Sequence, residues 1–322
     1  MVNALEGEVN NGGLQHDCHP QYAPTSHALS IPAVDTQAIQ HHRAHIASVL
    51  AEIGEWNTTV VGISFDGTGY GDDAAVWGGE IFVGSVADGY DRVAHLRPAI
   101  LPGGDAAAQN PVPAAAGFLS QLETLPDLTH APFNFPARYL SSVELVRKNV
   151  RAFPTTSVGR LFDTVAALLG FTRTISFEGQ AAIWLEQRAR TASNIDSYPF
   201  PFTDNELDFR PLLQAVLEDR SHGRDAAQIA RAFQRSVAEG LRNAALYLCT
   251  AHGADTLVLS GGVFQNELLL EDIQSMLATE PIRILTNHHV PPNDGGISLG
   301  QAAVAAFRHF DTNRQNTGHA HA

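Results

Sequence analysis

Cysteine is scarce in this chain of 322 residues. Its two cysteines, Cys18 and Cys249, lie far apart and in no metal-binding spacing, which excludes a disulfide framework and a zinc site made of thiolates. No apolar run approaches the roughly 20 residues that a membrane-spanning helix needs. The segment Met1–Gln15 also lacks the apolar core of a signal peptide. These absences predict a cytoplasmic protein with no membrane partner.

Basic side chains are also few. Lysine and arginine number 20 against 34 aspartates and glutamates, which gives a formal charge of −14. Because nonspecific binding to nucleic acid depends on clustered basic residues, we expect no nucleic-acid partner. The composition, with 44% hydrophobic and 17% charged residues, is that of a folded protein. The length favours two lobes with a cleft, as in an enzyme or a binding protein.

The apolar pattern predicts an α/β fold. In the first part, a strand is expected over 33–39, a helix over 42–55, a strand over 58–65, a glycine turn over 66–71, and strands over 79–83 and 92–97 that complete a meander. Helices are expected over 25–29, 159–169, 180–191 and 226–252. The last part alternates strand 256–259, helix 265–278, strand 282–286 and helix 297–310, which implies parallel strands with crossover helices.

Two histidines open the first long predicted helix. His41 and His45 are four residues apart, so their side chains share one helix face, about 5–6 Å apart at Cβ. Two neutral imidazoles in this arrangement can bind one divalent metal ion. Histidines on the surface or in the first turn of a helix give the same pattern, and the spacing alone leaves both interpretations open.

A first glycine-rich segment follows a predicted strand. Asp66 stands where the strand ends, so its carboxylate would project from the edge of a sheet, the usual place for ligand groups in α/β folds. Gly67 and Gly69, on either side of Thr68, leave backbone N–H groups free to approach a phosphate closely. Asp-Gly is also a favoured hairpin dipeptide, so an ordinary turn is the alternative.

Two more glycine turns precede predicted helices. Gly261 and Gly262 follow a strand and lead into a helix that carries Asn266, a geometry that suits an anion or a nucleotide at the helix N-terminus. Such turns also occur in folds that bind no phosphate. The second turn, Asn293–Gly296, repeats this pattern just before the last helix. Asp294 in this turn could belong to such a ligand site, or it could simply cap the helix.

Two further places could contact a ribose. Gly159 and Asp163 lie on one helical turn, and Glu178 and Gly179 lie at the start of another helix. Each could equally be a cap or a surface carboxylate.

Seven segments together resemble the carbamoyltransferase domain of the HypF family, in order and spacing, over about residues 40–306. They are HHRAHIASVLAE, VVGISFDGTGYGDDAAVWGGEIF, VAHLRPAILPGGDAA, GRLFDTVAALLG, ISFEGQAAI, LSGGVFQN and PPNDGGISLGQA. Upstream, HDCHPQYAPTSHAL over 16–29 is similar to a looser form of the segment that precedes the histidine motif in that family.

The resemblance implies a two-lobed fold of the actin and sugar-kinase ATPase superfamily. We expect residues 1–56 to be a remnant of the first lobe with the histidine helix, 57–312 to be a complete second lobe with the nucleotide loops, and 313–322 to be a disordered tail. In the family, an H-x-x-x-H pair and two aspartates bind iron or zinc, which implies the ligands His41, His45, Asp66 and Asp294 here. The nucleotide regions of the family, for ATP or carbamoyl adenylate, correspond to Gly67–Gly69, Gly159, Asp163, Glu178, Gly179, Gly261, Gly262 and Asn266.

The resemblance also implies a reaction and its partners. Members of the family convert carbamoyl phosphate and ATP into carbamoyl adenylate, then pass the carbamoyl group to the C-terminal cysteine of HypE, on the route to the cyanide ligand of [NiFe]-hydrogenase. The acceptor thiolate would come from that partner, and neither Cys18 nor Cys249 has a catalytic setting in the sequence.

The chain departs from full-length HypF in what precedes this domain. The acylphosphatase-like domain, the zinc-finger modules and the YrdC-like domain that makes the adenylate have no counterpart in the sequence, and the phosphate-loop hairpin of the first lobe is also missing. We therefore expect the adenylate from another domain or chain. The alternatives are a non-catalytic truncated paralogue that docks on hydrogenase-maturation partners and an O-carbamoyltransferase for a small metabolite.

Overall fold

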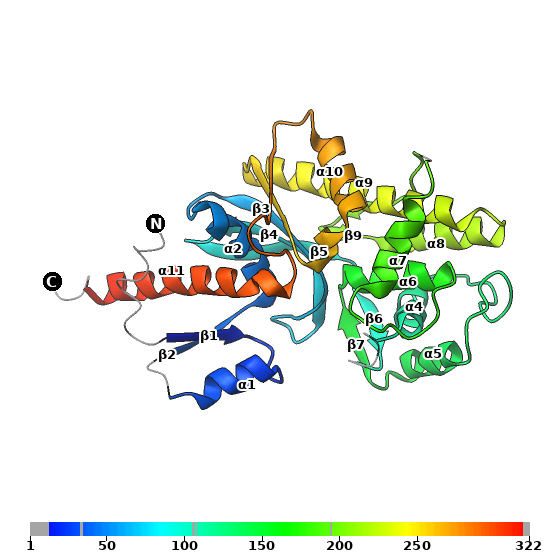
Figure 1. The fold of residues 1–322 in the computed structure, drawn as a ribbon, viewed down its shortest axis with the longest axis horizontal. Helices are drawn as coiled ribbons and strands as arrows, with labels where there is room; N and C mark the ends of the chain where they lie inside the picture. Colours follow the sequence, from blue (N-terminus) through cyan, green and yellow to red (C-terminus); the bar gives the residue numbers. More distant parts are fainter. Residues whose placement is uncertain (1–12, 33–34, 105–106, 108, 194, 318–322) are drawn as a thin grey trace.

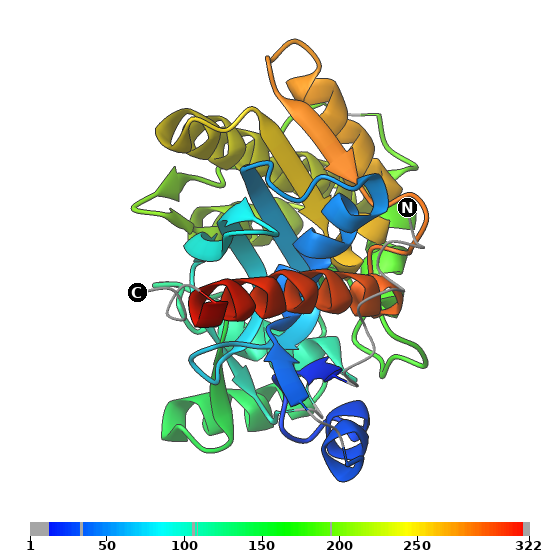
Figure 2. The same cartoon turned by 90° about the vertical axis from the view of Figure 1, so that its left-hand side faces the viewer.

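The structure is a computed structural model that describes residues 13–32, 35–104, 107, 109–193 and 195–317, with side chains as far as Phe307 in the last helix. A twisted sheet runs through the middle of the molecule (Figure 1, Figure 2). Helices α2 (His41–Ile53) and α11 (Ile297–Thr317) pack together beside it. The other long helices gather on the opposite side.

The centre of the sheet is the hairpin of β3 (Val60–Tyr70) and β4 (Val76–Ser85), with β5 (Gly89–Leu96) antiparallel to β4. On the other side of β3, β10 (Thr256–Ser260) and β11 (Arg283–Thr286) run parallel to it. The predicted meander and the predicted parallel strands are both confirmed. The shorter strands of this sheet are β6 (Ala99–Pro102), β7 (Ala152–Thr155), β8 (Phe202–Thr203) and β9 (Glu206–Leu207).

The sheet is covered on both faces, so its central strands β3, β4 and β10 are buried along most of their length. Val61, Ile63 and Phe65 of β3 belong to the larger core, whereas Val60 belongs to the core shared with α2 and α11. This alternation follows from the two-residue period of a strand. The helices that build the larger core with the sheet are α4 (Pro111–Leu119), α5 (Arg138–Lys148), α6 (Val158–Leu168), α7 (Gln180–Ala189), α8 (Phe209–Ser221), α9 (Ala226–His252) and α10 (Glu267–Leu277).

Helix α2 is anchored by its apolar stripe and by both of its ends. Ile46 and Leu50 are fully buried, and burial of such a side chain stabilises the fold by about 1.5–3 kcal/mol. The Gln40 side chain accepts a hydrogen bond from the Arg43 N–H at the start of the helix, and Gly54 ends it in the left-handed conformation. The helix therefore holds its first turn in a fixed place beside the sheet.

A small parallel sheet precedes α2. It consists of β1 (Gly13–Asp17) and β2 (Asp35–Ile39), joined through the helix α1 (Ala23–Ser30). The helix predicted over 25–29 and the strand predicted over 33–39 correspond to α1 and β2, although residues 33–34 lie outside the described residues.

One prediction about β3 is wrong. A glycine turn was expected over 66–71, but β3 continues to Tyr70 and the reversal of the chain falls after Gly71. The pairing with β4 shifts between Phe65 and Gly69, so the strand carries an irregularity in place of a turn. Asp66 and Gly67 lie in this unpaired stretch, which frees them for the site described below.

The structure also differs from the prediction for the C-terminal tail. Residues 313–317 were predicted to belong to a disordered tail, but they continue α11, because no glycine or proline interrupts the chain before residue 318. Residues 318–322 lie outside the described residues. The division of the chain into a first-lobe remnant and a second lobe at residue 56 stays a prediction.

Within the described part of the chain, none of the helices combines the length and the apolar composition that crossing a membrane requires.

Candidate metal and nucleotide site

The two histidines of the predicted pair lie side by side at the start of α2. Both side chains are almost completely buried, and their Nε2 atoms are 3.3 Å apart. Gln40, the residue before the helix, donates a hydrogen bond from its side-chain amide to the Tyr70 carbonyl oxygen at the end of β3. The first turn of the helix is thereby tied to the strand that carries Asp66.

Asp66 faces the histidines from the irregular part of β3. One carboxylate oxygen, Oδ2, lies 3.1 Å from Nε2 of His41 and 3.4 Å from Nε2 of His45. The other, Oδ1, accepts hydrogen bonds from the backbone N–H groups of Gly67, at 2.8 Å, and Gly262, at 3.1 Å. Asp66 therefore connects both predicted glycine segments to the histidine pair.

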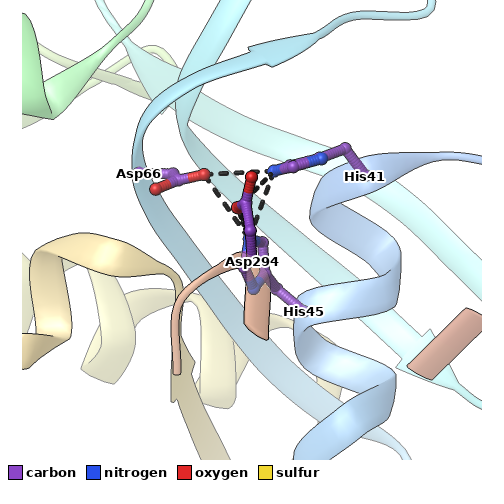
Figure 3. A group of neighbouring side chains, drawn as sticks. All are labelled: His41, His45, Asp66 and Asp294. Carbon is purple, nitrogen blue, oxygen red and sulfur yellow. Dashed lines mark hydrogen bonds and ion pairs between the residues drawn. The ribbon is translucent and has the colours of Figure 1, made fainter. Parts of the chain in front are cut away.

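Asp294 completes the cluster from the C-terminal side. It opens the short 3-10 helix η3 (Asp294–Gly296), which lies between β11 and α11. Its Oδ1 lies 3.4 Å from Nε2 of His41 and 3.7 Å from Nε2 of His45. Figure 3 shows the two carboxylates and the two imidazoles pointing toward one common centre. The Asp294 side chain is 61% exposed, so the cluster is open to solvent on this side.

Charge and burial oppose each other in this cluster. Burial lowers the pKa of His41, but hydrogen bonds to Asp17, Asp294 and Asp66 outweigh it and hold that pKa well above its usual value. Burial raises the pKa of Asp66, but hydrogen bonds from both histidines outweigh it and hold that pKa well below its usual value. Both effects have one cause, because two ionised carboxylates face two imidazoles. The centre of the cluster attracts positive charge.

The cluster fits a metal ion of the zinc or iron type. The four residues each offer one donor atom, and these atoms all lie within 4.8 Å of one another. Four donors at about 2.0–2.1 Å from a tetrahedral ion would lie about 3.3 Å apart. The five pair distances given above, 3.1 to 3.7 Å, are close to that value. Imidazole and carboxylate donors suit zinc and iron alike, so the donor set does not choose between them.

A pocket of about 590 Å³ opens beside the cluster. Asp66 and Asp294 form part of its wall. The rest comes from Gly67 of β3, from α6, from α7 with the turn before it, from η2 (Gly262–Gln265) with Asn266 after it, and from the loop that carries Asp294. This volume lies within the range of small-molecule sites. Seven of the predicted nucleotide residues line it, namely Gly67, Gly159, Asp163, Glu178, Gly179, Gly262 and Asn266.

Three predicted nucleotide residues, Thr68, Gly69 and Gly261, do not line this pocket. Gly69 lies against the histidines instead, because a Cβ there would come within 2.5 Å of the His42 ring. Gly261 has φ +102°, and a Cβ would meet the Phe65 carbonyl oxygen at 2.2 Å. Because neither glycine has a side chain, the backbone at both positions can approach its neighbours closely. These close contacts shape the site, although neither glycine lines the pocket.

The pocket wall is acidic. Among its described residues, Asp66, Asp163, Glu178, Glu186 and Asp294 carry carboxylates, whereas Arg160 is the only lysine or arginine. The Arg160 guanidinium lies 2.8 Å from Asp163, and burial raises the pKa of that carboxyl. Burial also raises the pKa of Glu178, and the negative charges of Asp66 and Asp294 add to this effect.

Some site residues were not predicted from the sequence. Arg160, Gln265 and Asn293 line the pocket and fall in segments that resemble the family, but those segments assign no role to them. Glu186 also lines the pocket and lies outside all of these segments. Asp17 contacts His41 from outside the cluster. Asp17 falls in the HDCHP segment that resembles the family, but the segment itself assigns no role to it.

Comparison with known proteins identifies the family of this chain. A family model described as the Kae1-like domain of carbamoyltransferases, second subdomain, matches residues 62–301, and a model of the HypF Kae1-like domain matches residues 7–52. Carbamoyltransferase HypF2 of Cupriavidus necator is 34% identical over 94% of this chain and 40% of its own length. A HypF homolog from the same organism is 33% identical over 95% of this chain and 80% of its own length.

A solved structure gives the same result. The crystal structure of full-length HypF in its phosphate- and nucleotide-bound form has a TM-score of 0.83 and 33% identity, covering 94% of this chain and 49% of that one. The chain thus spans about two fifths of HypF2 and about half of the solved HypF chain. The likeness confirms the predicted α/β fold of the actin and sugar-kinase type. The chain belongs to the HypF family of carbamoyltransferases.

Proposed function

We propose that this chain carries out the carbamoyl-transfer half of the HypF reaction in [NiFe]-hydrogenase maturation. In this reaction the carbamoyl group of carbamoyl adenylate passes to the C-terminal cysteine of a HypE-like acceptor protein. The observation that carries the proposal is the cluster of His41, His45, Asp66 and Asp294 beside a pocket large enough for a nucleotide, with the two aspartates in the pocket wall.

The charge of the pocket supports a metal ion in this role. Adenylates and phosphates are anions, yet the wall holds five carboxylates against one arginine. An anion would be repelled unless a cation offset this charge. The zinc or iron ion, when bound, supplies that positive charge and can polarise the carbamoyl oxygen.

The residues of the chain bind and orient the reactants. Gly67 and Gly262 border the pocket, and because neither has a side chain, the phosphate of the adenylate can approach the backbone closely there. Glu178 lines the pocket, and in the proposal it accepts hydrogen bonds from ribose hydroxyls. The acceptor thiolate attacks the carbamoyl carbon, the bond from that carbon to the phosphate oxygen breaks, and AMP leaves with the electron pair. The thiol proton is released to solvent before the attack.

Two reactants come from outside this chain in the proposal. An adenylate-forming domain or chain supplies carbamoyl adenylate, and the acceptor supplies the cysteine. Cys249 is buried, and burial raises the pKa of its thiol to about 11, which makes it a poor nucleophile. Cys249 is a free thiol, which suits a reducing cytoplasm, and we place the reaction there.

The test is metal content by elemental analysis of the untagged protein, with nucleotide binding followed by calorimetry on the same samples. Wild type is compared with His41→Ala and Asp294→Ala. His130→Ala serves as the matched control, because His130 is exposed and pairs with Asp127 on the surface. We expect about one metal ion per chain in wild type and control, with loss of metal and of nucleotide affinity in both site variants.

A second assay tests the transfer itself. The chain is mixed with carbamoyl phosphate, ATP, a separate adenylate-forming protein and a HypE-like acceptor, and mass spectrometry follows carbamoylation of the C-terminal cysteine. Product that depends on all components and on His41 supports the proposal. A wild-type chain that binds neither metal nor nucleotide, and that yields no product, contradicts it and favours a docking role instead.

A further inference from the structure

A buried carboxylate outside the four-residue cluster contacts one of its histidines. Oδ2 of Asp17 lies 2.8 Å from Nδ1 of His41, and Asp17 is only 7% exposed. The Nε2 atom on the opposite side of the same ring faces Asp66 and Asp294. The imidazole therefore lies between Asp17 and the centre of the cluster, and Asp17 itself does not reach that centre.

The backbone brings Asp17 to this position. Asp17 is the last residue of β1, and the parallel register of β1 with β2 places it opposite Ile39. The chain continues from Ile39 through Gln40 directly into His41, so the end of one strand lies beside the first residue of the helix. A residue 24 positions away in sequence thus meets the histidine through strand pairing.

Local hydrogen bonds fix the direction of the carboxylate. Its other oxygen, Oδ1, accepts a hydrogen bond of 2.8 Å from the His19 backbone N–H. The Thr25 hydroxyl donates to the Asp17 carbonyl oxygen at 3.2 Å, which ties the segment to α1. Oδ2 is left to face the imidazole.

This contact selects one arrangement of the His41 ring. An ionised carboxylate can only accept, so Nδ1 of His41 must carry a proton and donate it. The lone pair available for a metal ion is then on Nε2, the atom that faces the two aspartate ligands. Carboxylates in this outer position orient a ligand imidazole and raise its basicity. Among the described residues, no carboxylate lies at Nδ1 of His45, so the effect is specific to His41.

We propose that Asp17 is a positioning residue that holds His41 in the tautomer and ring orientation needed for metal binding. The inference rests on the metal site proposed above and assigns part of that site to the segment before α2.

The experiment measures zinc affinity of the full-length chain by competition with a chelator. Asp17→Ala removes the carboxylate, and Asp17→Asn keeps its shape and an acceptor oxygen without the charge. Thr25→Ala is the matched control, because it removes an anchor of the same segment without touching the carboxylate. We expect Asp17→Ala to bind zinc about 10- to 100-fold more weakly, Asp17→Asn to fall between it and wild type, and Thr25→Ala to match wild type.

A second readout reports on the ring directly. In the zinc-loaded wild type, nitrogen-detected NMR should show an exchange-protected N–H proton on Nδ1 of His41, and this signal should be lost in Asp17→Ala. If Asp17→Ala binds zinc as tightly as wild type does, the inference about Asp17 is overturned, but the proposed metal site is not. Equal losses in Asp17→Ala and Thr25→Ala also overturn it, because they would show displacement of the segment. A wild type that binds no zinc overturns both the inference and the metal site on which it rests.

Discussion

At the scale of single residues, Gly69 controls how closely β3 approaches the histidines. A Cβ at this position would lie 2.5 Å from Cε1 of His42 and 2.8 Å from Cδ2 of His41. Both rings are buried, so they have no free space into which to move. We expect Gly69→Ala to weaken zinc binding about tenfold by shifting His41, and to lower the free energy of unfolding by about 1–3 kcal/mol through overpacking.

Gly240→Ala separates these two effects. Gly240 lies in α9 far along the chain, where a Cβ would meet the Phe200 ring at 2.4 Å, so the overpacking is similar. It should destabilise the protein to a comparable degree and leave zinc affinity unchanged. Chemical denaturation and chelator competition on both variants make the comparison. Equal zinc affinities in the two variants would show that Gly69 has no special relation to the site.

At the scale of elements, Glu52 connects α2 to the loop that carries Asp294. Its carboxylate accepts three backbone N–H groups, from His288 at 2.8 Å, His289 at 3.0 Å and Val290 at 2.9 Å. Burial raises the pKa of Glu52, but these hydrogen bonds outweigh it and lower the pKa below its usual value. The charged form is therefore the one that holds the loop against the helix.

We expect Glu52→Gln to lower the free energy of unfolding of the metal-free protein by about 1–2 kcal/mol at pH 7. Because the folded pKa is depressed, this stabilisation is present above the unfolded pKa of about 4.3 and is lost as the pH falls through the folded value. Urea denaturation should thus show a difference between wild type and variant at pH 7 that shrinks below about pH 4. Glu55→Gln is the control, since Glu55 pairs with Arg283 near the surface, and such pairs contribute little. A difference that is constant with pH would contradict this assignment.

The elements that sequence could predict are those with strong local signals. The bounds of α9 were predicted as Ala226–His252, because the apolar period is sustained and Asp225 and Gly253 cap its ends. The almost completely buried helix α4 has no polar face and therefore no visible period. The end of β3 was missed because Asp-Gly-Thr-Gly reads locally as a turn, whereas pairing with β4 decides the strand.

The residues of the candidate site could likewise be predicted from local sequence only where the signal is local. The spacing of His41 and His45 indicates a metal pair from local geometry alone. The addition of Asp66 and Asp294 came from resemblance, since no local rule brings residues 66 and 294 to one helix. Asp17 was not predicted, because its contact depends on the register of β1 against β2, which only the folded chain defines.

At the scale of the whole molecule, the four candidate ligands join three separate parts of the structure. The histidines belong to α2, Asp66 belongs to the central sheet, and Asp294 belongs to the loop between β11 and α11. A metal ion bound to all four would cross-link α2, the central sheet and the C-terminal segment. The unfolded chain has no such site, so binding should stabilise the folded state.

This coupling can be measured as a shift in thermal unfolding. At a free zinc concentration about 1,000 times the dissociation constant, binding to the folded state alone stabilises it by about 4 kcal/mol. We expect the zinc-loaded wild type to melt at a clearly higher temperature than the chelator-treated protein, and hydrogen exchange to slow in α2 and in the 287–296 loop together. His41→Ala should melt at the same temperature with and without zinc, because one ligand is missing and the cross-link fails. Slower exchange confined to α2 would contradict the cross-link, since it would mean that Asp294 takes no part in binding and that the histidine pair binds the ion alone.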